Sequence, residues 1–344
     1  MPNVISTLTR PNGWNCNNPL KMKRFLILAA LSAALVALSA PSSQAQTLER
    51  TGEFSSFDAI NVTGPFEVNF IPSDKYTVKF VVEAVLADYV VFTQRENVIY
   101  VSYAEKDVPK EVKKIFKGRK NPDPTLQMTV YAPRLSEIVL YGTSVLNVDA
   151  EMTGDKLDVS LADKAKVAAL RARAENVGIN LKNKASVTMN LDVPGSLAIW
   201  TEGGSNARIT GKFGSVSTVS AGSSTIAVEG ESEEVAVKSD GTSQVSVKSK
   251  TGKVRIESGN SSKVSLEGSA TDLEILGKNN AVTDVRKMEV DAVTLTLNSS
   301  TAHVGAKKKL VLELTGGAEV FYEGDPEMSI VKIVKSTLAP TGTK

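Results

Sequence analysis

Cysteine and histidine are almost missing from this 344-residue sequence, which contains only Cys16 and His303. A single cysteine cannot form an internal disulfide or a zinc site built from several thiolates. Aromatic residues are also scarce, at 6% of the chain, whereas charged residues make up 23%. This composition favours an elongated protein with a thin aliphatic core. We predict no metal site and no cofactor.

Motifs of several enzyme classes are missing as well. The chain has no Walker loop, no HExxH motif, and no dinucleotide fingerprint between a strand and a helix. Its net charge is +2, but residues 1–45 hold four basic and no acidic residues, so the rest carries 36 basic and 38 acidic residues, a net charge of −2. A nearly neutral chain gives no electrostatic reason to expect nucleic acid as a partner.

The amino-terminal segment has the pattern of a secretory signal peptide. Two basic residues precede an apolar run from Phe25 to Leu38, and the small-x-small pattern Ser43-Gln44-Ala45 follows. An uncleaved anchor is the alternative, but the run is shorter than the roughly twenty residues that span a bilayer. We expect residues 1–21 to be upstream sequence and residues 22–45 to be a signal peptide. The mature chain, without a transmembrane segment, is then exported to the periplasm, the outer-membrane surface or the extracellular space.

Residues 142–334 contain a unit of about nineteen residues that recurs about ten times. One position of the unit holds only glycine, asparagine or aspartate: Gly142, Asp163, Asn183, Gly203, Gly222, Gly241, Asn260, Asn279, Asn298 and Gly316. Two places further on, only serine or alanine occurs: Ser144, Ala165, Ala185, Ser205, Ser224, Ser243, Ser262, Ala281, Ser300 and Ala318. Because the first three residue types tolerate a positive φ, this position predicts a backbone corner in every coil, with room beside it for only a small side chain.

Apolar residues alternate on both sides of each corner, as at Ile226 and Val228. Alternation with a period of two is typical of strands that have one face inward. Two short strands per coil at a constant spacing predict an all-β fold, a single elongated parallel β-solenoid. In one coil Val293, Leu295 and Leu297 are displaced by one residue, which indicates a bulge.

Residues 46–141 are also rich in strand-forming residues, but their spacing is irregular, and breakers such as Gly64-Pro65 interrupt them. The terminal repeats of a solenoid are atypical because one face has no neighbour. We therefore expect irregular amino-terminal coils that act as a cap, with a basic helical insertion at residues 106–120. At the other end, residues 335–344 are expected to form a disordered tail.

Four short motifs carry a family resemblance: Phe57-Asp58-Ala59-Ile60-Asn61-Val62, Gly64-Pro65-Phe66-Glu67-Val68, Ala132-Pro133-Arg134-Leu135 and Gly142-Thr143-Ser144. With these motifs and the repeat that follows them, the chain resembles the head GIN domain family (DUF2807), whose members are described as autotransporter adhesin heads. The resemblance implies a secreted or envelope β-helical protein of Gram-negative bacteria. It implies no established enzymatic activity and no catalytic residues.

Two surface features are candidate binding sites. Trp200 occupies a position that should point outward, with Val219 beside it on the next coil, and an exposed tryptophan can stack on a sugar or anchor a protein partner. The alternative is that the amino-terminal region covers it. Lys113, Lys114 and Lys117 lie on the basic insertion, which either contacts anionic lipid headgroups or forms the solvated face of a cap helix.

Catalysis on a β-helix would require acids on adjacent coils. Glu257 and Glu274 are spaced to lie diagonally across one face, but Arg255 should stack against Glu274, so a surface ion pair is the simpler interpretation. His303 is predicted to point outward from its strand. The many serines are explained by the repeat, so a Ser-His-Asp site is not predicted.

These observations favour a secreted, non-enzymatic β-solenoid that serves as a cell-envelope structural or adhesin-like binding module. Two other classes stay open. One is a polysaccharide-active β-helix enzyme, either a lyase or a hydrolase, and the other is a self-assembling envelope structural protein whose ends or sides associate. The expected partner is a glycan or another envelope protein.

Overall fold

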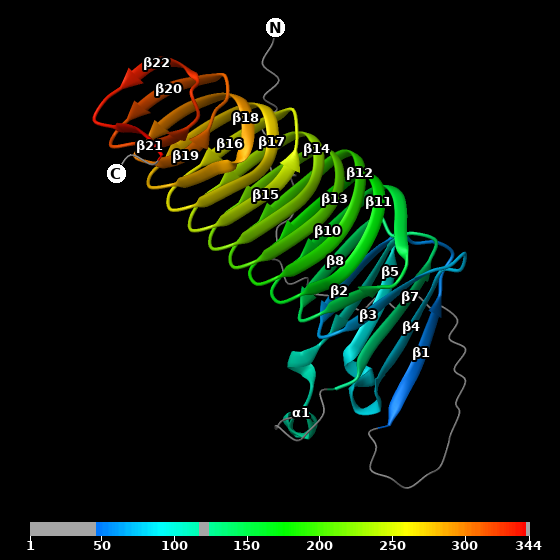
Figure 1. The fold of residues 1–344 in the computed structure, drawn as a ribbon. Coiled ribbons are helices and arrows are strands. Elements are labelled where there is room, and N and C mark those ends of the chain that lie inside the picture. The colour runs from blue at the N-terminus through cyan, green and yellow to red at the C-terminus, as the bar shows by residue number, and fades with distance from the viewer. Residues whose placement is uncertain (1–45, 117–123, 342–344) are drawn as a thin grey trace. The chain divides into compact units, whose positions relative to one another are not determined.

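The computed structural model describes residues 46–116 and 124–341 (Figure 1). These residues belong to one compact unit, and the chain is 70% strand and 5% helix. They form a parallel β-solenoid of about 11 turns with about 19 residues per turn, which confirms the predicted fold class. The expected upstream sequence 1–21, the expected signal peptide 22–45 and Lys117 lie outside the described residues. Over the described part of the chain, no helix is long and apolar enough to cross a membrane.

Each regular coil is one long strand that bends midway, or two shorter strands at equivalent places. The continuous strands are β11 (Lys166–Leu181), β12 (Ser186–Thr201), β13 (Asn206–Ser220), β14 (Thr225–Ser239), β17 (Lys263–Lys278) and β18 (Val282–Asn298). The divided coils are β9 (Val145–Val148) with β10 (Glu151–Leu161), β15 (Gln244–Lys250) with β16 (Lys253–Ser258), β19 (Thr301–Gly305) with β20 (Lys309–Thr315), and β21 (Glu319–Glu323) with β22 (Glu327–Ile333). The two short strands predicted per coil are therefore, in most coils, the two legs of one bent strand.

A left-handed backbone corner links each coil to the next. Positive φ occurs at nine of the ten predicted corner residues, from Gly142 (φ 77°) to Gly316 (φ 67°). Asparagine occupies this corner as well as glycine does, as at Asn183 (φ 64°). Its short polar side chain can hydrogen-bond locally, so asparagine adopts the left-handed backbone conformation more readily than most residues. The exception is Asn298, since in that coil the corner lies at Ser299 (φ 51°).

A bulge in β18 explains the displaced corner. Ser265 pairs with Asp284, but Glu267 pairs with Lys287, so β18 contains one residue more than β17 between the same two pairs. An extra residue in one strand moves the residues after it by one position. The predicted bulge is confirmed, whereas the predicted corner at Asn298 is wrong by one residue.

The serine or alanine beside each corner faces the interior, and all ten of these side chains are at most 3% exposed. Five of the six serine hydroxyls are hydrogen-bonded there, and the exception is Ser300. Ser224 Oγ donates to the Ala221 carbonyl at 2.9 Å and accepts from Thr201 Oγ1 at 2.9 Å. In the next coil Ser243 Oγ donates to the Asp240 carbonyl at 2.6 Å. The small residues thus fill the space beside the corner and tie the turn to the strand.

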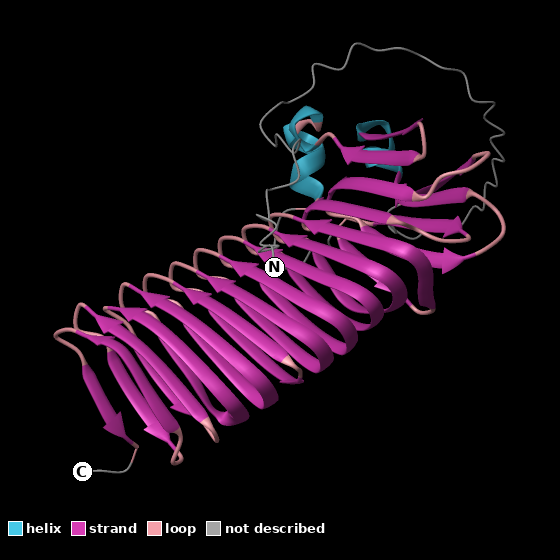
Figure 2. Cartoon of the chain, turned by 90° about the horizontal axis from the view of Figure 1, so that it is seen from above, coloured by secondary structure: helices cyan, strands magenta, loops and turns pink. Residues whose placement is uncertain are grey.

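Antiparallel strands close the amino-terminal end (Figure 2). β2 (Ala59–Gly64) and β3 (Glu67–Pro72) begin the parallel stack by pairing with β8 (Glu137–Gly142) and β9. On the far side of β2 lie β6 (Val98–Tyr103) and then β5 (Val90–Arg95). On the far side of β3 lie β7 (Leu126–Ala132), β4 (Thr77–Glu83) and β1 (Thr47–Glu53).

This cap also contains short helices and buried aromatic rings. Two 3-10 turns, Ala84–Tyr89 and Glu105–Asp107, and the helix α1 (Lys110–Ile115) lie in its connections. Phe57 and Phe80 are each 1% exposed in the core. The expected irregular amino-terminal coils and cap are confirmed.

The carboxyl-terminal end is built differently. The last strand, β23 (Thr337–Pro340), pairs in parallel with β21, and its Leu338 packs against the core. Residues 335–344 were expected to form a disordered tail, but residues 337–340 form a strand because Leu338 continues the inward apolar row of the solenoid. The other end strand, β22, pairs with β20 alone among the described residues.

Candidate functional site

Outward side chains form rows along the solenoid because equivalent residues of neighbouring coils pair in parallel register. Each row places one side chain about every 4.8 Å, the spacing between neighbouring strands. On the leg that follows the corner, one row runs through Ala227, Ser246 and Ser265, and a second row runs through Glu229, Lys248 and Glu267. The repeat therefore builds its surface from columns of side chains rather than from loops.

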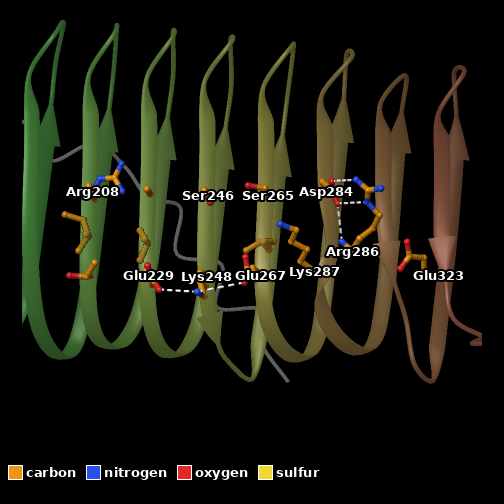
Figure 3. Close-up of a pocket in the computed structure, with 15 residues that line it drawn as sticks. Arg208, Glu229, Ser246, Lys248, Ser265, Glu267, Asp284, Arg286, Lys287 and Glu323 are labelled. Carbon is orange, nitrogen blue, oxygen red and sulfur yellow. Dashed lines mark hydrogen bonds and ion pairs between the residues drawn. The ribbon is translucent and has the colours of Figure 1, made fainter. Parts of the chain in front are cut away.

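These rows form a groove with a volume of about 780 Å³ (Figure 3). The small side chains of Ala227, Ser246 and Ser265 form its floor. The longer side chains of Arg208 and Asp284 lie at the two ends of the same row. The groove crosses the consecutive coils from β13 to β18. We call it the outer groove.

An alternating charge ladder lines one side of the outer groove. Lys248 Nζ lies 3.3 Å from Glu229 Oε1 and 3.9 Å from Glu267 Oε1, so one ammonium bridges the two carboxylates on the coils that flank its own. All three side chains are about half exposed, and exposed pairs of this kind stabilise a fold by about 0–1 kcal/mol. Their main consequence is to hold three charged groups in fixed positions at the edge of the groove.

The bulge of β18 places a second charged pair at the end of the groove. Arg286 donates to Asp284 from Nε at 3.0 Å and from Nη2 at 2.6 Å. These side-chain hydrogen bonds lower the pKa of Asp284 below its ordinary value, although partial burial opposes them. On the next coils His303 lies beside Asp284 and stacks on Phe321, with ring centroids 4.9 Å apart and planes 14° apart.

The outer groove can therefore offer hydrogen-bond donors and acceptors at a regular spacing. An extended polymer that lies across the coils would meet equivalent positions in succession. No group of three or more histidine, cysteine, aspartate or glutamate residues suited to a metal ion occurs in residues 46–116 and 124–341. The chemistry that this surface supports best is recognition of a polar ligand.

The structure brings Trp200 and Val219 together as neighbours in parallel register on β12 and β13. Both are half-buried on the outer face of the leg before the corner. The adjacent row contains Ala198 and Ser217, also paired side by side, so the tryptophan stands next to a strip of small side chains. This second surface lies on the other leg of the coil from the outer groove.

In the described part of the basic insertion, residues 106–116, the α-helix is the short α1. Lys113 is half-buried and Lys114 is exposed on α1, whose N-cap residue is Pro109. Because α1 lies between β6 and β7 in the amino-terminal cap, its lysines come from a different part of the fold than Trp200.

Glu257 and Glu274, the two acids that the sequence offered for catalysis, both form ion pairs with Arg255. Arg255 Nη1 lies 2.5 Å from Glu274 Oε2, and Arg255 Nη2 lies 3.3 Å from Glu257 Oε1. Lys238 Nζ is 3.9 Å from the other oxygen of Glu257. The predicted stacking of Arg255 on Glu274 is correct, and it gives both carboxylates a structural partner.

A closer pair of acids lies near the capped end and was not found from the sequence. Glu137 of β8 is directly beside Asp158 of β10. Burial, followed by the charge of Asp158, raises the pKa of Glu137 above its ordinary value. Lys156 Nζ lies 2.5 Å from Asp158 Oδ2 and neutralises that carboxylate. These acids are separated by 21 residues in the irregular first coils, so the nineteen-residue period did not align them.

The outer groove was also missed, although the sequence contains a signal for it. Small residues recur at Ala227, Ser246 and Ser265, one per unit, and charges alternate in sign two places after each of them. When the units are aligned on their corners, both rows appear at fixed outward positions.

The stacked corners and outward rows define the chain as a parallel β-solenoid with a polar outer groove. It belongs to the family described as "Putative auto-transporter adhesin, head GIN domain" (DUF2807), whose profile matches residues 56–230 and 195–326. No curated protein matches the chain.

Several solved structures are similar to the chain. A "putative lipid binding protein" from Parabacteroides distasonis is 14% identical, with 86% of this chain and 95% of that chain covered and a TM-score of 0.38. A "putative adhesin" from Parabacteroides merdae is 15% identical, with 86% and 96% covered and a TM-score of 0.38. Another from Bacteroides fragilis is 16% identical, with 87% and 98% covered and a TM-score of 0.31.

Proposed function

We propose that this protein is an exported, non-enzymatic, adhesin-like binding module of the bacterial cell envelope. The observation that carries the proposal is the outer groove, in which one outward side chain per coil is repeated across β13 to β18. Membership in a family described as adhesin heads supports a binding role. The signal pattern of residues 22–45 supports export.

The proposed ligand is a glycan or another envelope protein in extended form. Hydroxyl groups of a sugar chain both donate and accept hydrogen bonds, and the groove supplies carboxylates, an ammonium and serine hydroxyls from Glu229, Lys248, Ser246 and Ser265. Because an ion pair joins Glu229 and Lys248, these two side chains lose less conformational entropy when the ligand binds.

Two further surfaces are proposed as secondary contacts. Trp200 with Val219 offers an aromatic platform beside small side chains. Lys113, Lys114 and Lys117 would contribute positive charge toward anionic lipid headgroups. Trp200→Ala and a charge reversal of the three lysines measure their contributions separately.

The test is a glycan array, together with capture of envelope proteins, probed with the labelled full chain. Ser246→Trp fills the floor of the outer groove without entering the core, because Ser246 is exposed. Its matched control is Thr296→Trp, at an exposed outward residue of β18 on the other leg, several coils away from Trp200. We expect Ser246→Trp to weaken ligand binding at least about tenfold, which corresponds to about 1.4 kcal/mol, and Thr296→Trp to leave it unchanged. Equal binding by both variants, or no ligand on either screen, would contradict the proposal.

A further inference from the structure

Two of the four bases that line the outer groove have no acid to neutralise them. Lys248 and Arg286 are paired with acids of the same groove. Arg208 and Lys287 also line the groove and are exposed, but within the described part of the chain neither side chain makes an ion pair or a hydrogen bond. The groove therefore has two positive charges that are free to bind an anion.

The bulge of β18 is the source of one free base. Arg286 and Lys287 are consecutive, yet both are exposed, whereas consecutive residues of a regular strand point to opposite faces. Arg286 donates to Asp284 of its own strand, which leaves Lys287 as an additional outward cation. Lys287 stands beside Glu267 in register, but the carboxylate of Glu267 interacts with Lys248.

The two free bases lie at opposite ends of the groove. Arg208 is on β13 and Lys287 is on β18, four coil steps further along, so their strands are about 19 Å apart. Figure 3 shows the side chain of Arg208 directed toward the coil of Glu229, and that of Lys287 directed toward the coil of Ser265. Both cations thus point along the groove toward its floor. A ligand that crosses these coils can place one anionic group at each end.

The middle of the groove carries the opposite charge. Glu229 and Glu267 flank the single ammonium of Lys248, so two carboxylates and one ammonium give this side a net charge of −1. A ligand with an anion at every coil would meet repulsion there. The charges of the groove therefore fit a chain whose anionic groups are separated by uncharged units.

The place of the groove in the sheet favours a glycan over a peptide. An extended peptide is commonly recognised by adding a strand to an open sheet edge. The outer groove instead crosses the strands from β13 to β18, and each of these strands already pairs with neighbours on both sides. It offers side-chain groups, including the hydroxyls of Ser246 and Ser265, which can exchange hydrogen bonds with the hydroxyls of a sugar.

We propose that the outer groove binds a linear acidic glycan, with one carboxylate or sulfate group on Arg208 and another on Lys287. Uncharged sugar lies over the small side chains of the floor between them. The guanidinium of Arg208 can hold such an anion through two parallel hydrogen bonds, whereas Lys287 acts as a point charge. This inference rests on the proposed function of the groove and adds the chemical class of its ligand.

The first experiment compares charged glycans with their neutral parents by isothermal titration calorimetry on the full chain. Partly and fully methyl-esterified pectin form the carboxylate pair, and sparsely sulfated dextran and dextran form the sulfate pair. In at least one pair we expect the charged member to bind at least about tenfold more tightly, and that pair identifies the anion. If neither charged polymer binds more tightly than its parent, the inference is overturned. Tighter binding of poly-glutamate than of both charged glycans would overturn it in favour of an acidic peptide.

The second experiment removes the free bases one at a time. Arg208→Gln and Lys287→Gln should each weaken binding of the preferred charged glycan at least about threefold, because each variant removes one exposed ion-pair partner. The matched control is Lys253→Gln, which removes an exposed lysine of β16 on the other leg and should leave binding unchanged. Circular dichroism establishes that the variants remain folded. Losses no larger than that of the control would overturn the inference.

Salt dependence distinguishes lost attraction from a disturbed groove. The Debye length falls from about 30 Å at an ionic strength of about 0.01 M to about 3 Å at about 1 M. Binding by the wild type should weaken over this range, and binding by the double variant Arg208→Gln with Lys287→Gln should weaken less; equal salt dependence would overturn the inference. If Ser246→Trp abolishes binding while the double variant binds normally, the groove remains the proposed site but its ligand is not held by anionic groups.

Discussion

Ser224→Leu is expected to destabilise the solenoid strongly, although it changes one residue beside a turn. Ser224 is 0% exposed, and its hydroxyl makes 2.9 Å hydrogen bonds with the Ala221 carbonyl and Thr201 Oγ1. Additional carbon atoms in a filled site cost about 1–3 kcal/mol. The loss of two hydrogen bonds costs about 0.5–1.5 kcal/mol each. Together these give a loss of about 2–6 kcal/mol in the free energy of unfolding.

Two companion variants separate the contributions. Ser224→Ala keeps the space but removes both hydrogen bonds, so it should cost about 1–3 kcal/mol, and alanine already occupies this position in four other coils, as at Ala165. Thr225→Leu, one residue further on, changes a half-buried outward side chain and should lie within about 0.5 kcal/mol of the wild type. Urea denaturation followed by circular dichroism measures all three. Equal midpoints for Ser224→Leu and Thr225→Leu would refute the inward assignment of this position.

Three further expectations follow from the repeat and its charges. Deletion of residues 241–259, one unit, should leave a shorter solenoid with the same β-sheet circular dichroism, whereas deletion of nine residues from this unit should abolish folding; equal solubility of both would contradict the assigned period. Gly222→Val should lower the melting temperature, because φ is +73° and an added Cβ would lie 2.9 Å from the Gly203 carbonyl oxygen; an unchanged value would argue against a strained corner. Since Arg286 lowers the pKa of Asp284, the stability that this pair contributes is present above the ordinary aspartate pKa and is lost as the pH falls through the lowered value. Arg286→Ala should raise the pKa of Asp284 in a carboxyl NMR titration, and no change would contradict the pairing.

The sequence was sufficient to predict the solenoid because its rarest requirement, a positive φ once per coil, admits few residue types. Nine of the ten predicted corners have this φ, and the displacement of Val293 correctly indicated the bulge in β18. The corner at Ser299 was missed because serine has no strong preference for that region. The antiparallel cap was recognised only as a cap, since its strand order depends on long-range pairing that no local period encodes.

The candidate sites were harder to predict than the fold. Trp200 and Val219 were correctly placed side by side, because their spacing equals one unit. The outer groove depends on the relative size of side chains along a row, and a search for catalytic motifs does not test for that. The acid pair Glu137 and Asp158 spans the irregular coils, where the spacing differs from the repeat.

The outer groove is proposed to bind its ligand and to leave it chemically unchanged. The most direct measurement is to incubate the full chain with each polysaccharide that it retains and to analyse the recovered sugar by mass spectrometry. We expect intact polysaccharide, with binding that depends on Ser246 and is unaltered by Glu137→Gln, Glu257→Gln or Glu274→Gln. An enzyme would lose its rate when its acid or base is removed. Polysaccharide fragments that form with the wild type and disappear with any one of these three variants would show that the protein is an enzyme.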